Sequence, residues 1–167
     1  MLRSSPAGTP RSQAGVMLLE ALIGILIFSL GILAMIGLQG RSIAAAADAQ
    51  YRSEAASLAE QIIAQIWLSA DRTSTTALQT SVSAFRYNVA GSSCSYSGGA
   101  VTAGNTALSD WVTAVTSTST TRLPGATAAM QQVLVDTAAS NLVTVTVCWQ
   151  APNDAQPRKH VITASIS

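Results

Sequence analysis

The residue with the clearest chemical role lies in the least polar part of the chain. Glu20 is the single ionisable residue in the 23-residue run VMLLEALIGILIFSLGILAMIGL, which extends from Val16 to Leu38. A carboxylate at the centre of a bilayer helix costs on the order of 3 kcal/mol, and acids within membranes usually have a partner. The run contains no Lys or Arg, so a cation for Glu20 must come from elsewhere. The alternative is a side chain that only snorkels to the headgroups.

The run itself has the length and composition of a membrane helix. At about 1.5 Å per residue it extends roughly 34 Å, which is enough to cross a hydrocarbon core of about 30 Å. The residues before it carry Arg3 and Arg11 and no acid. The positive-inside rule then leaves the N-terminus in the cytoplasm and everything after Leu38 outside it. We therefore predict that residues 16–38 span a membrane.

Two kinds of N-terminal processing compete for this segment. A secretory signal peptide would be cut near the run Ala44–Ala47 and would release a secreted protein, such as an enzyme. Its apolar region is normally 7–15 residues long, whereas this run is longer and contains Glu20 near its start. We favour the second interpretation, in which a short polar leader is removed and the apolar run is retained.

The residues at that junction are Gly15-Val16-Met17-Leu18-Leu19-Glu20. A glycine that closes a basic leader, an apolar run and a glutamate five residues past the glycine resemble the type IV prepilin signature. The resemblance implies cleavage after Gly15 by a prepilin peptidase, with residues 1–15 as the leader. It also implies N-methylation of Val16, where many members have Phe, and pairing of Glu20 with the amine of Val16 in the same or a neighbouring subunit.

The apolar pattern changes after Leu38 but does not stop. Residues 39–69 form an amphipathic continuation, and one helix is predicted from about Val16 to about Leu68. Gly24 and Gly31 are interpreted as positions of close helix packing. The apolar stripe recurs at three- and four-residue spacing and consists of Ala44, Ala47, Tyr51, Ala55, Leu58, Ile62 and Ile66.

Residues 70–167 are expected to form a small domain outside the cytoplasm. Residues 71–83 show no clear period, and residues 91–106 are typical of a loop. A strand is predicted at 84–89, and a short helix after a cap at Asn105. Three extended segments, Met130–Val135, Leu142–Trp149 and Val161–Ile166, predict an antiparallel meander. A turn is predicted over Pro152–His160.

This part of the chain also resembles a narrower group. Trp111, the turn Leu123-Pro124-Gly125 and the strand Val143–Trp149 are similar to the C-terminal half of PilV-type minor pilins, the type IV pilus modification proteins. The resemblance implies an α+β type IV pilin fold, in which a long N-terminal helix packs on a small antiparallel sheet. Large buried aromatic side chains are more often core residues than ligand stackers, so we assign Trp111 and Trp149 to the core.

The two cysteines, Cys94 and Cys148, both fall in the part expected to lie outside the cytoplasm. An oxidising compartment favours a disulfide between them. A redox-active pair would more often be close in sequence, so we interpret the bond as structural.

Composition excludes several function classes. One His and two Cys are too few for a usual zinc site, so no metal and no cofactor is expected. The formal charge of +1 is spread along the chain, which makes nucleic acid an unlikely partner. The densest basic cluster is Arg158-Lys159-His160, which we expect to be a solvated turn. No catalytic motif is present, and no enzyme activity is expected.

The prediction is a minor pilin that is single-pass in the inner membrane, with its C-terminal domain in the periplasm, and extracellular after assembly. The resemblance implies major and minor pilins, the inner-membrane assembly machinery and lipid as partners, and roles in pilus assembly, adhesion and twitching motility. A type II secretion pseudopilin is the nearest alternative. A pilus-tip module that binds a surface or DNA is another.

Overall fold

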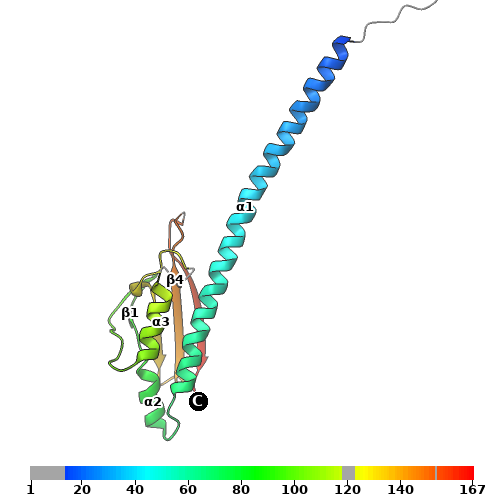
Figure 1. Ribbon diagram of the computed structural model, residues 1–167. Helices are drawn as coiled ribbons and strands as arrows, with labels where there is room; N and C mark the ends of the chain where they lie inside the picture. Colours follow the sequence, from blue (N-terminus) through cyan, green and yellow to red (C-terminus); the bar gives the residue numbers. More distant parts are fainter. Residues whose placement is uncertain (1–13, 118–122, 153) are drawn as a thin grey trace, which may run out of the picture. The chain divides into compact units, whose positions relative to one another are not determined.

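The computed structural model describes residues 14–117, 123–152 and 154–167. Its longest element is helix α1, Ala14–Ser69, which confirms the predicted helix and begins two residues before Val16. The chain divides into two compact units, one ending at Ala46 and one covering Ala47–Ser167. The second unit combines the end of α1 with a small antiparallel sheet, an α+β arrangement (Figure 1).

The part of α1 in the second unit supplies one side of the hydrophobic core. Ala55, Leu58, Ile62 and Ile66 are buried, and they recur at the three- and four-residue spacing that places side chains on one helix face. Ala44, which the sequence pattern placed on the same stripe, is exposed. The buried face therefore begins later along α1 than the sequence pattern indicates.

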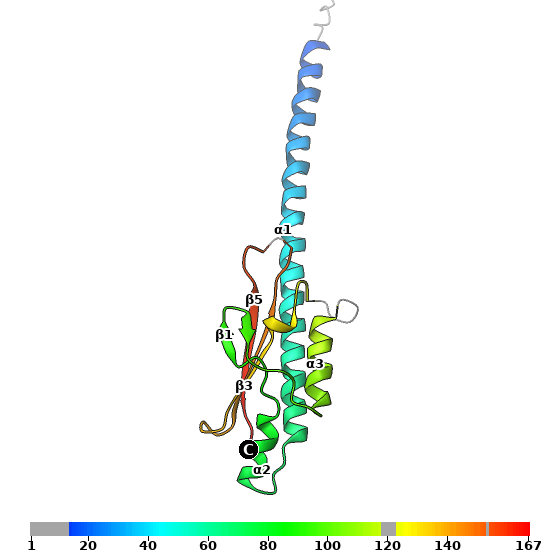
Figure 2. The ribbon, with the colours of Figure 1, turned by 90° about the vertical axis from the view of Figure 1, so that its left-hand side faces the viewer.

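A three-stranded antiparallel sheet packs against this helix face (Figure 2). Its strands are β3, Gln132–Asp136, β4, Leu142–Trp149, and β5, Arg158–Ser165, in the order β3-β4-β5. Alternate side chains of a strand point to opposite faces, and one face carries the buried valines Val133, Val135, Val143, Val145 and Val147. The predicted meander is confirmed, although β5 begins at Arg158, inside the predicted turn.

Helix α3, Thr106–Thr116, lies beside the second part of α1 in both ribbon views (Figures 1 and 2). Its predicted cap is confirmed, because the Asn105 side chain accepts a hydrogen bond from the Leu108 amide at 3.0 Å. Trp111 is 2% exposed and donates from Nε1 to the Leu58 carbonyl of α1 at 2.7 Å. Trp149 is also buried, so the assignment of both tryptophans to the core is confirmed.

Two local predictions were wrong, and one segment for which no structure was predicted is helical. Residues within 71–83 form helix α2, Thr75–Ser83, whose N-terminus is capped by the Ser74 side chain. The predicted strand at 84–89 is reduced to a single bridge between Tyr87 and Val133, because Asn88 has a positive φ of 48°. The predicted loop at 91–106 contains a short hairpin of β1, Ala90–Ser92, and β2, Ser95–Ser97.

The turn at Leu123-Pro124-Gly125 contacts the residue that follows β4. Leu123 is buried, and the Gln150 amide donates to the Pro124 carbonyl at 2.9 Å. Gly125 has a φ of +63°, and a Cβ there would lie 2.6 Å from the Gln150 carbonyl oxygen. Glycine is needed at this position because both the backbone angle and the close approach exclude a side chain.

Candidate functional site

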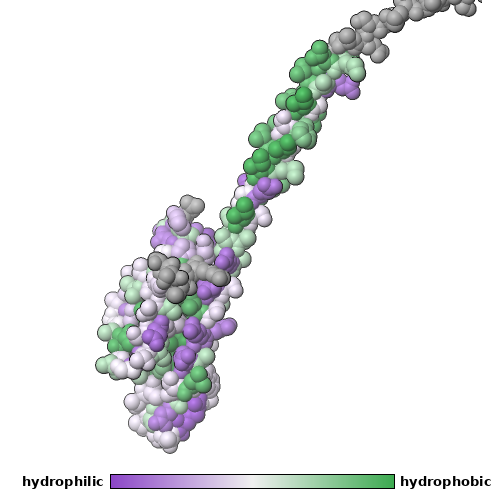
Figure 3. Space-filling model, viewed as in Figure 1, coloured by the Kyte–Doolittle hydropathy of each residue, from purple (hydrophilic) through white to green (hydrophobic). Residues whose placement is uncertain are grey.

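The first unit presents an unbroken apolar surface. Every Val, Leu, Ile, Met and Phe side chain from Val16 to Leu38 is exposed, the least of them, Ile32, by 42%. Hydrophobic residues dominate this stretch of α1 in the space-filling view (Figure 3). Helix α1 is long and apolar enough to cross a membrane. An exposed apolar surface of this extent requires lipid or another protein to cover it.

The two polar side chains within this run, Glu20 and Ser29, differ in whether their own helix supplies a hydrogen-bond partner. The Ser29 hydroxyl donates to the Ile25 carbonyl at 2.7 Å, so its own helix satisfies it. Glu20 is exposed and has no hydrogen bond or ion pair to any residue that the structure describes. The carboxylate of Glu20 is therefore the one group in the run that still needs a partner from outside its own helix.

The proposed processing junction lies at the very start of α1. Of the predicted leader, residues 1–13 are outside the described residues, whereas Ala14 and Gly15 already belong to the helix. Val16 is 69% exposed. Four residues, about one helical turn, separate Val16 from Glu20, so a free amine at Val16 would lie within about 6 Å of axial distance from the carboxylate.

In the second unit, Cys94 and Cys148 form a disulfide, as predicted. Cys94 lies in the turn between β1 and β2, and Cys148 lies on β4, on the sheet face opposite the buried valines. Tyr96 and Met130 pack against the bond. The disulfide thus attaches the β1–β2 hairpin to the face of the sheet that does not contact α1.

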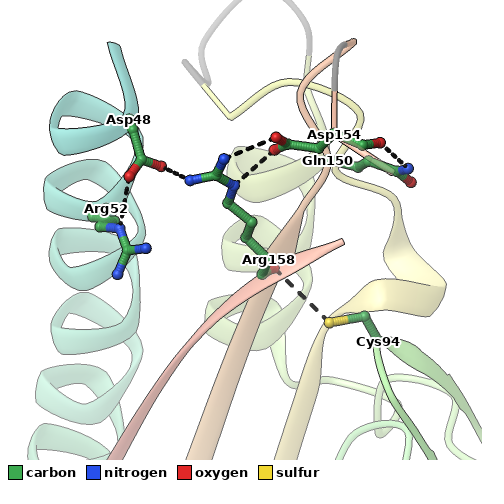
Figure 4. A network of polar contacts seen from close by, with 6 residues as sticks. All are labelled: Asp48, Arg52, Cys94, Gln150, Asp154 and Arg158. Carbon is green, nitrogen blue, oxygen red and sulfur yellow. Dashed lines mark hydrogen bonds and ion pairs between the residues drawn. The ribbon is translucent and has the colours of Figure 1, made fainter. Parts of the chain in front are cut away.

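A polar network joins α1 to the beginning of β5 (Figure 4). The guanidinium of Arg158 donates to both oxygens of Asp154 at 2.8 Å and also to Asp48 of α1. Asp48 accepts a second hydrogen bond from Arg52 at 3.1 Å. The Gln150 side chain donates to the Asp154 carbonyl at 2.9 Å. One cation therefore holds the segment between β4 and β5 against α1.

The charges in this network reinforce one another. The hydrogen bonds from Arg158 lower the pKa of Asp154 below its usual 3.8, although partial burial opposes the shift. The same hydrogen bonds to Asp154 raise the pKa of Arg158, with a smaller contribution from Asp48. The predicted solvated basic turn is therefore wrong at Arg158, because this residue begins a strand and its charge is shared between two carboxylates.

We expect the contribution of Asp154 to stability to depend on pH. A carboxyl with a lowered pKa in the folded state stabilises the fold above its unfolded pKa, and this contribution is lost as the pH falls through the folded value. Asp154→Asn should therefore lower the urea midpoint of the full chain in detergent at about pH 7, and the difference from wild type should shrink below about pH 3. Arg158 keeps its charge throughout, since its pKa is raised.

The matched control for this variant is Glu60→Gln, which removes an exposed acid that makes no polar contact among the described residues. Its effect on the midpoint should be small at both pH values. An Asp154→Asn difference that is equally large in acid would contradict the assignment of the stabilisation to an ionised pair.

His160 is half-buried on β5, and no group of three or more His, Cys, Asp or Glu residues within the described ranges is placed to hold a metal ion. Comparisons of the chain with protein-family models, curated proteins and solved structures found no match.

Proposed function

We propose that this chain is a minor pilin of a type IV pilus with a type IV pilin fold. In this proposal α1 anchors it in the inner membrane and its second unit lies in the periplasm. It then enters the filament, where it primes or modifies assembly and so supports adhesion and twitching motility. Major and minor pilins, the prepilin peptidase, the assembly machinery and lipid are its partners. Its role is that of a structural subunit, with no enzyme activity.

One observation carries the proposal: a helix with an exposed apolar surface and one unsatisfied acid continues into the core of a folded domain. Residues 16–38 of α1 need a cover, whereas Ala55, Leu58, Ile62 and Ile66 of the same helix are buried in the second unit. A signal peptide has no need of such continuity. A cut near Ala44–Ala47 would also fall inside an unbroken helix.

Glu20 explains why the proposed cover is another pilin as well as lipid. Lipid satisfies the apolar side chains but offers no cation at the depth of the acid. Packing against neighbouring stem helices would bury the same apolar surface, and the amine of Val16 would supply the charge partner. Apolar helices can pack against one another in many axial registers. Glu20 then favours the register in which its carboxylate meets the amine of Val16.

Cleavage at the junction tests this function. Gly15→Leu should leave an uncleaved chain in the membrane fraction and abolish its presence in sheared filaments, because the leader would block the amine of Val16. Gly40→Ala is the matched control, since a Cβ at Gly40 meets nothing within 4 Å and the residue lies outside the junction. Immunoblots of the two fractions measure both variants. A wild-type chain that is absent from pili and required for secretion would favour the pseudopilin alternative.

A further inference from the structure

The second unit contains an open groove between α1 and α3. It has a volume of about 470 Å³ and is lined by Gln61 and Gln65 of α1 and by Thr106, Ala107, Asp110, Trp111 and Ala114 of α3. The two helices that form its walls lie side by side in both ribbon views (Figures 1 and 2). Because the Nε1 group of Trp111 is bonded to Leu58 of α1, the two walls are fixed relative to each other.

Three polar side chains that line the groove have no protein partner among the described residues. Asp110, Gln61 and Gln65 make no side-chain hydrogen bond or ion pair with any described residue. Asp110 is also the only charged residue of α3, and the part of α1 that follows Arg52 carries acids but no Lys or Arg. The groove therefore has acceptor oxygens and negative charge, with no cation of its own nearby in sequence.

Part of the groove lining on α3 is apolar. Ala107, Trp111 and Ala114 follow one another at four- and three-residue spacing along α3, so they share one helix face. Trp111 is only 2% exposed, which leaves no aromatic face for a planar ligand to stack on. The small side chains of Ala107 and Ala114 offer an apolar surface to an aliphatic chain.

We propose that this groove binds an arginine side chain of a partner protein. A guanidinium has five N–H donors in a planar fork and pairs with a carboxylate through two parallel hydrogen bonds. Asp110 supplies that carboxylate, and the carboxamide oxygens of Gln61 and Gln65 accept the remaining donors. The methylene groups of the arginine contact Ala107 and Ala114. A lysine has the same charge, but its compact ammonium cannot form the two parallel hydrogen bonds of a guanidinium. This interaction does not depend on whether the chain enters a filament.

The test uses the full-length, isotope-labelled chain in detergent micelles and the peptide acetyl-Gly-Arg-Gly-amide. Matched peptides carry citrulline, which keeps the shape without the charge, or lysine, which keeps the charge without the fork. Backbone amide signals of α3 and the side-chain amide signals of Gln61 and Gln65 are followed by NMR. The arginine peptide should give saturable shifts at these signals, the lysine peptide should bind several-fold more weakly, and the citrulline peptide should not bind.

Two variants separate a specific site from general electrostatics. Asp110→Asn should weaken binding of the arginine peptide by about tenfold or more, the effect expected for loss of a charge-assisted bidentate pair. Glu60→Gln removes the same charge from α1 at a residue that does not line the groove, and it should leave the affinity nearly unchanged. Gln61→Ala, at an exposed position, should weaken binding without affecting folding.

Equal weakening by Asp110→Asn and Glu60→Gln would overturn the proposal, because the attraction would then be a diffuse field effect. Equal affinity for the arginine and lysine peptides, or the absence of saturable shifts on α3, would also overturn it. Unchanged signals elsewhere in each variant show that the fold is intact, so a loss of binding reports on the groove itself.

Discussion

Glu20→Ala should remove the chain from filaments while leaving at least the wild-type amount in the membrane. Removing the carboxylate lowers the cost of membrane insertion, by less than the roughly 3 kcal/mol of a group at the bilayer centre because Glu20 lies near one end of the run, so insertion does not suffer. Assembly loses the one group in the apolar run that can distinguish one register of packed helices from another. We expect the ratio of filament to membrane chain to fall by about tenfold or more, since each tenfold corresponds to about 1.4 kcal/mol.

Two further variants make this result specific. Glu20→Gln keeps the shape of the side chain without the charge and should behave like Glu20→Ala. Ser29→Ala removes a polar group whose hydroxyl is already satisfied by the Ile25 carbonyl, and it should leave the ratio unchanged. Fractionation followed by immunoblotting measures all three variants. Wild-type incorporation of Glu20→Ala would contradict the proposed role of the carboxylate.

The double variant Cys94→Ala/Cys148→Ala should lose about 4 kcal/mol of the unfolding free energy, by the chain-entropy estimate for a loop of this length. The bond joins residues separated by 54 positions in sequence. It also attaches the β1–β2 hairpin, whose two strands have only three residues each, to the sheet. Because small domains are stabilised by only about 5–15 kcal/mol, this loss is a large fraction of the total.

Urea unfolding of the full chain in detergent, followed by tryptophan fluorescence, measures this loss. Wild-type protein treated with reductant is the matched control, and its midpoint should fall to that of the double variant. A double variant with the wild-type midpoint would show that packing of Tyr96 and Met130 alone is enough to hold the hairpin.

The elements that the sequence predicted correctly share strong local signals. Helix α1 has an apolar run followed by a stripe at helical spacing, α3 follows an Asn105 cap, and β4 alternates valine with threonine. Each of these signals arises within a single segment. Each of the three elements also contributes residues to the hydrophobic core. The disulfide was also predictable, because only two cysteines are present and both follow the apolar run.

The missed elements depend on contacts between distant segments or on weak signals. Helix α2 is rich in Thr and Ser, which have low intrinsic helix propensity, and only the Ser74 cap distinguishes it. Tyr87 has a strand-like sequence environment, yet the positive φ of Asn88 ends its pairing with Val133. The contact between Asp48 and Arg158 joins residues 110 positions apart, and nothing in either local sequence indicates it. The groove beside Asp110 likewise requires two helices from different parts of the chain.

We propose that the apolar helix is retained after a leader is removed at Gly15, and the mass of the intact mature protein distinguishes this processing from its alternatives. Chain purified from membranes or filaments should have the mass of residues 16–167 with one added methyl group and two hydrogens fewer, for the disulfide. A mature chain that begins near Ala47, or one that retains Met1, would contradict the account.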